Sequence, residues 1–113
     1  MTWLSVLGAW LVAYVFTQAI EVPLYLRITD GRWRVALLAS TLTHPIVWFV
    51  FPEVCPLSWG YWGMVAAAEA FAVAGEAAWL SFSGVGSSLK WALLVNAASA
   101  TGGLLLRATF GVP

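Results

Sequence analysis

Charged residues are scarce in this sequence of 113 residues. Five basic and five acidic side chains make up 9% of the chain and leave a formal net charge of zero. Soluble domains carry about 25% charged residues, so this chain lacks the polar surface that such a domain needs. It also has no run of basic residues, which argues against a nucleic-acid partner.

Cysteine and histidine each occur once, as Cys55 and His44. A single cysteine excludes an internal disulfide and a metal site built from several thiolates. The sequence also contains neither a Glu-x-x-His nor a His-Glu-x-x-His motif, and these are common patterns of metal ligands on helices. No cofactor is therefore predicted, and enzyme activity is the least favoured of the functions considered below.

Apolar residues, by contrast, are abundant: 62% of the chain is hydrophobic and its mean hydropathy is +0.89. Four apolar stretches fall at about residues 3–26, 33–51, 59–82 and 89–110. Each is long enough to cross a hydrocarbon core about 30 Å thick. The sequence predicts an all-α integral membrane protein in which residues 1–113 form a single four-helix transmembrane domain.

Polar residues inside these spans gather on one face of each helix. Glu69 and Glu76 are seven residues apart in the third span, so they lie two turns apart on the same face. We therefore predict a polar core with two layers, counted at about 1.5 Å of depth per residue. One layer contains Glu21, Glu76 and Asn96, and the other, nearer the bilayer centre, contains Gln18, His44, Glu69 and Ser99.

This core limits the chemistry of the protein. A charged side chain that faces lipid costs several kcal/mol, so the polar faces are expected to meet inside a helix bundle. Three acids and one imidazole cannot all be charged there without partners. Pro23 and Pro45 lack a backbone N–H and are expected to loosen the helix beside Glu21 and His44. The sequence thus predicts a site that binds protons, a cation or a small polar solute.

The short loops predict the orientation of the chain. Basic residues favour the cytoplasmic side, and most of them lie in or beside the loops at residues 27–34 and 83–90. We predict an inner or plasma membrane protein with the arginine-rich first loop in the cytoplasm and both termini outside. Aromatic residues near the helix ends, such as Tyr25 and Tyr61, are expected to anchor the spans at the lipid headgroups.

An internal similarity predicts two related hairpins. Residues 34–44, RVALLASTLTH, align with residues 90–100, KWALLVNAASA, and a shift of one residue places Glu21 on Glu76. A duplication of this kind would relate the two hairpins by a pseudo-twofold axis along the membrane normal, as in transporters with parallel repeats.

Three functions are compatible with these features. The first is a transporter or channel-like unit, expected as a homo-oligomer because one small bundle barely encloses a path. In length, helix count and an acid in the first helix the chain is similar to the small multidrug transporters, an analogy that carries over no residue roles. The second is a non-catalytic subunit or assembly factor of a larger membrane complex, and the third is an intramembrane metal-dependent enzyme. Membrane lipid is a predicted partner in each case.

Overall fold

The computed structural model describes residues 3–110, so the ends of the predicted domain, residues 1–2 and 111–113, lie outside it. The described chain is helical between short turns. Its elements are α1 (Trp3–Ile28), α2 (Trp33–Thr41), α3 (His44–Phe49), α4 (Phe51–Val54), the 3-10 turn η1 (Leu57–Trp59), α5 (Gly60–Phe82) and α6 (Ser88–Phe110). Four segments are long and apolar enough to cross a membrane, which confirms the predicted all-helical chain with four candidate spans.

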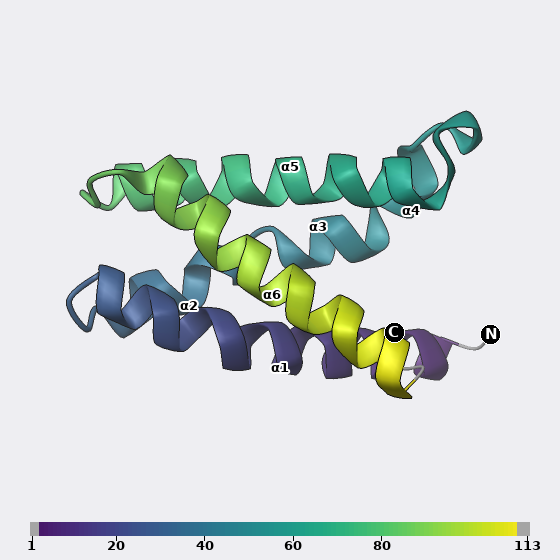
Figure 1. The fold of residues 1–113 in the computed structure, drawn as a ribbon, viewed down its shortest axis with the longest axis horizontal. Coiled ribbons are helices and arrows are strands. Elements are labelled where there is room, and N and C mark those ends of the chain that lie inside the picture. Colours follow the sequence, from purple (N-terminus) through teal and green to yellow (C-terminus); the bar gives the residue numbers. More distant parts are fainter. Residues whose placement is uncertain (1–2, 111–113) are drawn as a thin grey trace.

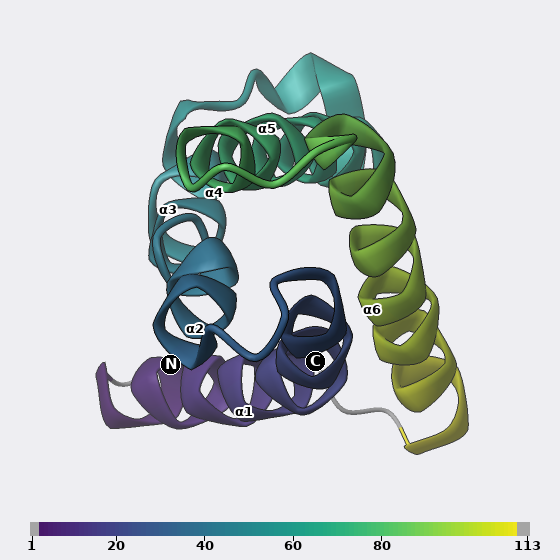
Figure 2. The same ribbon diagram turned by 90° about the vertical axis from the view of Figure 1, so that its left-hand side faces the viewer.

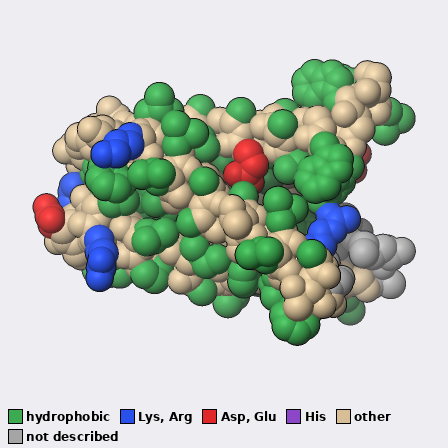
Figure 3. Space-filling model, viewed as in Figure 1, with side chains coloured by type: hydrophobic (Ala, Val, Ile, Leu, Met, Phe, Trp, Pro, Cys, Tyr) green, Lys and Arg blue, Asp and Glu red, His purple; other side chains and the backbone are tan. Residues whose placement is uncertain are grey.

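The outer surface of these helices is apolar. Large hydrophobic side chains such as Leu4, Val15 and Leu105 are more than half exposed. Figure 3 shows green hydrophobic side chains along the whole face that carries α6, with most of the visible basic side chains at one end. Helices that are apolar on their exposed faces are compatible with a membrane location, because lipid tails can cover those faces.

The four spans surround a common centre. Seen along the long axis of the molecule, α1, the α2–α3 segment, α5 and α6 occupy the four sides of a square (Figure 2). Contacts join α1 to α2, α2 to α5, α5 to α6 and α6 to α1. Helices α1 and α5 therefore lie across the ring from each other, and inward-pointing side chains from every span share its interior.

Helix α6 crosses the bundle obliquely. It starts beside the end of α5 and runs diagonally toward the first half of α1, so α5 and α6 diverge along their length (Figure 1). The apolar core gathers at the end where the two helices are still close. Its buried members are Tyr25, Ala36, Ala39, Ala77, Leu80, Ala92 and Val95.

The second span is broken, where the sequence predicted one helix from 33 to 51. Helix α2 ends at Thr41 and α3 begins at His44. Pro45, in the first turn of α3, cannot donate the backbone hydrogen bond that would continue the helical ladder to the Thr41 carbonyl. The expected loosening at Pro45 is thus a break of two residues, Leu42 and Thr43, whose backbone keeps right-handed helical angles. Beyond it, residues 52–58, which separate the predicted second and third spans, begin inside the short helix α4.

The two predicted hairpins differ in one respect. The span formed by α2, α3 and α4 is interrupted, whereas α6 is a continuous helix. Helix α1 is also continuous and passes through Pro23 to Ile28. The duplication and the orientation in the membrane stay predictions.

Candidate functional site

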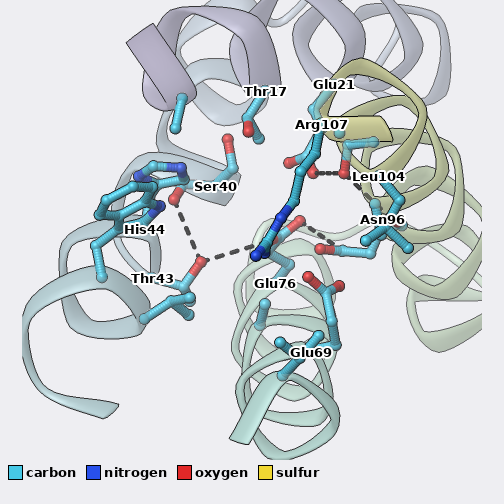
Figure 4. Close-up of a pocket in the computed structure, with 18 of the residues that line it drawn as sticks. Thr17, Glu21, Ser40, Thr43, His44, Glu69, Glu76, Asn96, Leu104 and Arg107 are labelled. Atoms are coloured by element: carbon cyan, nitrogen blue, oxygen red, sulfur yellow. Dashed lines mark hydrogen bonds between the residues drawn. The ribbon is translucent and has the colours of Figure 1, made fainter. Parts of the chain in front are cut away.

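A cavity of about 240 Å³ lies between the helices, with walls from α1, α2, α3, α5 and α6. Most of the site residues predicted from the sequence line it: Glu21, His44, Glu69, Glu76, Asn96 and Ser99. Gln18 is not part of its wall. Figure 4 shows Glu21, on α1, and Glu76, on α5, pointing into the cavity from opposite sides.

Glu76 is the most thoroughly hydrogen-bonded of the acids. Only 2% of its surface is exposed. Its Oε1 accepts hydrogen bonds from the Tyr25 hydroxyl at 2.5 Å and from Asn96 Nδ2 at 2.9 Å. Its Oε2 accepts one from the Thr43 hydroxyl at 3.3 Å. Because these donors come from α1, from α6 and from the break in the second span, Glu76 joins all four spans.

The contact with Thr43 depends on a glycine in α5. A Cβ atom at Gly75 would lie 2.7 Å from Thr43 Cγ2, closer than carbon atoms approach in proteins. The absence of a side chain at Gly75 therefore lets the break in the second span approach α5. This places the Thr43 hydroxyl within reach of Glu76, the next residue along α5.

Glu21 is as buried as Glu76 but less well paired. Its Oε2 accepts a hydrogen bond from the Ser99 hydroxyl at 2.5 Å. Its Oε1 is buried and has no hydrogen-bond partner within residues 3–110. Buried polar atoms are nearly always paired, so an orphan oxygen on a cavity wall indicates a place for a water molecule, a proton or a ligand.

Helix α6 links the two buried acids. Asn96 donates to Glu76, and Ser99, one turn further along the same face, donates to Glu21. The sequence predicted this shared face correctly. It placed Ser99 and Glu21 in separate layers, however, and that was wrong because α6 crosses the bundle obliquely, so residue counts along different helices do not give a common depth.

Gln18 belongs to a separate polar group between α1 and α2. Its Nε2 donates to Thr41 Oγ1 at 2.8 Å and to the Tyr14 hydroxyl at 3.2 Å, and its Oε1 accepts a hydrogen bond from Ser40. Ser40 also lines the cavity. Gln18 thus holds Ser40, a residue of the cavity wall, by a hydrogen bond and does not itself line the cavity.

His44 sits in an aromatic cluster at the edge of the cavity. Its Nδ1 accepts a hydrogen bond from Trp10 Nε1 at 3.0 Å, and the rings of Trp10, Tyr14 and Trp48 pack around it. Within the described chain no hydrogen bond joins His44 to an acidic side chain. Its predicted role as a proton relay stays a prediction.

Glu69 and Arg107 lie where α5 and α6 diverge. Glu69 is half-buried, lines the cavity and has neither a hydrogen bond nor an ion pair within residues 3–110. Figure 3 shows an acidic side chain, in red, between these helices. The Arg107 guanidinium lies 4.7 Å from the centre of the Tyr61 ring and donates a hydrogen bond to the Tyr61 hydroxyl. In Figure 4 the Arg107 side chain extends across the cavity.

Three partners of the site were not assigned to it from the sequence. Tyr25 was expected at the lipid headgroups, but it is fully buried against Glu76, which corrects that assignment. The available signal was its position one turn after Glu21 on the same polar stripe. Arg107 was used only as one of the basic residues that predict the orientation in the membrane, and Tyr61 only as a headgroup anchor. Nothing in the sequence indicates that the start of α5 lies beside the end of α6.

The described residues, 3–110, contain no group of three or more histidine, cysteine, aspartate or glutamate side chains placed to hold a metal ion. Comparison of the chain with protein-family models, with curated proteins and with solved structures found no match. The function must therefore be inferred from the geometry of the cavity itself.

Proposed function

We propose that this chain is a membrane-embedded binding unit, a transporter or channel-like protein, that takes up protons, a cation or a small polar solute in the cavity between its spans. The observation that carries this proposal is the unpartnered Oε1 of Glu21, which is buried on the wall of a cavity that also holds Glu69 and Glu76.

A structural role accounts for only part of the acid cluster. Glu76 has donors for both of its oxygens, as expected of a carboxylate that holds helices together. Glu21 Oε1 and the Glu69 carboxyl group have none within the described chain. Buried charges that lack a partner are costly, and Glu21 and Glu76 are close enough to interact electrostatically. A proton or a bound cation would relieve both costs.

The surrounding helices favour a route into this site. Interrupted helices border the binding sites of many transporters, because their free backbone groups and their joints lie beside the ligand. Here the break between α2 and α3 brings Thr43 to the cavity. The divergence of α5 and α6 opens the same cavity on another side, and we propose that the access paths follow these two features.

The test is a proton titration of the purified protein in detergent between about pH 6 and 9, where a carboxyl group in water is already ionised. We expect Glu21→Gln and Glu69→Gln each to change the number of protons released over this range. Glu53→Gln is the matched control, because Glu53 is exposed on α4 and does not line the cavity. Circular dichroism checks that each variant is folded.

An unchanged titration in both folded cavity variants would contradict the proposal. If the same substitutions then altered only the association of the protein with other membrane proteins, the alternative of a subunit in a larger membrane complex would replace it. If the titration changes as expected, flux of protons across liposomes that contain the protein is the next measurement.

A further inference from the structure

The arrangement of donors and acceptors in the cavity defines a ligand class. We propose that the cavity binds a linear alkyl diamine in its doubly protonated form, with one ammonium group between Glu21 and Glu76 and the other at Glu69. This inference, which rests on the proposed function, names the solute that the acid cluster would take up.

Most of the hydroxyl donors at the inner end of the cavity are already used within the protein. The hydroxyl hydrogen of Ser99 is used on Glu21 Oε2, that of Ser40 on Gln18, and that of Thr43 on Glu76 or the Ser40 carbonyl. What remains there is the Thr17 hydroxyl, the unpartnered Glu21 Oε1 and the lone pairs of the hydroxyl oxygens, so acceptors outnumber free donors. A ligand that fits such a site brings its own N–H donors, as a primary ammonium group does.

The second ammonium group is placed by Glu69. This carboxyl group lies on the same face of α5 as Glu76, about 10 Å along the helix axis, and has no protein partner within residues 3–110. Figure 4 shows both carboxyl groups rising from α5 into the cavity. With N···O distances of about 2.8 Å at each end, two ammonium groups joined by roughly four or five methylene groups span this separation.

The wall between the two acids suits an alkyl linker. Ala72 is buried on α5 between Glu69 and Glu76 and lines the cavity. The cavity wall also includes the apolar residues Ala13, Val47, Trp48, Val65, Ala100 and Leu104. A polar linker would leave its hydrogen-bonding groups unpaired against these side chains, whereas methylene groups lose nothing there.

Charge and volume agree with a small dication. Within residues 3–110, three carboxylates and one guanidinium line the cavity, a net charge of −2 when all four are ionised. A protonated diamine neutralises that charge. The cavity, at about 240 Å³, is larger than a bound proton or one water molecule requires. It has room for a short organic ion.

The experiment is calorimetric titration of the protein in detergent with four amines. They are n-butylamine, 1,2-diaminoethane, 1,4-diaminobutane and the doubly quaternary form of 1,4-diaminobutane, in which each nitrogen carries three methyl groups. We expect 1,4-diaminobutane to bind about tenfold or more tightly than n-butylamine, because it makes a second charge-assisted contact. The short diamine spans less of the separation between the acids, and the methylated one has no N–H groups, so both should bind more weakly than 1,4-diaminobutane.

Two variants locate the ends of the ligand. Glu69→Gln should reduce the affinity for 1,4-diaminobutane to about that for n-butylamine and leave n-butylamine binding unchanged. Glu21→Gln should weaken both amines, and Glu53→Gln, the control on α4, should weaken neither.

The outcomes separate this inference from the proposed function. Equal binding of the monoamine and the diamine, equal binding of the methylated compound, or an absence of amine binding by a protein whose acids still titrate as expected would each overturn the diamine inference alone. If no amine binds and the titration of the cavity variants is also unchanged, both proposals are wrong.

Discussion

The hydroxyl of Tyr25 on α1 donates a hydrogen bond of 2.5 Å to Glu76 on α5, across the diagonal of the helix ring. Both side chains are almost fully buried. Since α1 and α5 are not neighbours in the ring, this bond and the bonds of Asn96 and Thr43 to the same carboxyl group hold opposite sides of the bundle together. The site and the fold therefore depend on one acid.

Tyr25→Phe is expected to lower the free energy of unfolding by about 1–3 kcal/mol, because a buried carboxylate oxygen loses one of its two donors. Unfolding by dodecyl sulfate in mixed micelles, followed by circular dichroism, measures this change. Tyr61→Phe is the control, since its hydroxyl bonds Arg107 at an exposed position where little stability should be lost. Equal effects of the two substitutions would argue against the central role of the Tyr25 bond.

Gly75→Ala is expected to destabilise the protein by about 1–3 kcal/mol, because the new methyl group overlaps Thr43 Cγ2. The same unfolding experiment applies. Gly103→Ala serves as the matched control, as nothing lies within 4 Å of a Cβ at that position, and it should be neutral or slightly stabilising in a helix. Adding Thr43→Ser to Gly75→Ala removes the clashing methyl group but keeps the hydroxyl, so the double variant should recover most of the loss. No recovery would mean that the clash is elsewhere.

Glu76→Gln and Glu21→Gln are expected to differ, although both acids are buried. At Glu76 the N–H groups of the new amide would face donors that are already present. This should lower the free energy of unfolding by about 1–3 kcal/mol. At Glu21 the amide oxygen still accepts from Ser99, and the amide nitrogen takes the place of the unpartnered Oε1. The Glu21→Gln variant should therefore have a free energy of unfolding close to that of the unaltered protein. A larger loss at Glu21 than at Glu76 would contradict the hydrogen-bond assignment.

Helix periodicity was sufficient to find much of this site. The spans are visible as long apolar runs, and Asn96, Ser99, Glu21 and Glu76 follow from the rule that residues three, four or seven apart share a face. Periodicity within one helix carries no information about which helix lies opposite. The bond between Tyr25 and Glu76 and the proximity of Arg107 to Tyr61 required the arrangement in space.

The break in the second span shows the same limit. Pro45 predicts that a backbone hydrogen bond is missing, but the length of the interruption depends on packing against α5, which Gly75 permits. The two-layer depth estimate failed for a related reason, since the tilt of α6 is set by its neighbours and not by its own residues.

Arg107→Gln is expected to tighten the binding of a cation in the cavity several-fold at low salt, because it removes a positive side chain from the cavity wall. The gain should shrink as salt is added, since Arg107 is exposed and its field is screened over about 10 Å at 0.1 M salt. Calorimetric titration with 1,4-diaminobutane at two salt concentrations measures both effects. Arg34→Gln is the control, because Arg34 is exposed at the start of α2, stacks on Trp33 and does not line the cavity. Weaker binding in Arg107→Gln would instead show that the guanidinium holds the cavity in its binding form through Tyr61.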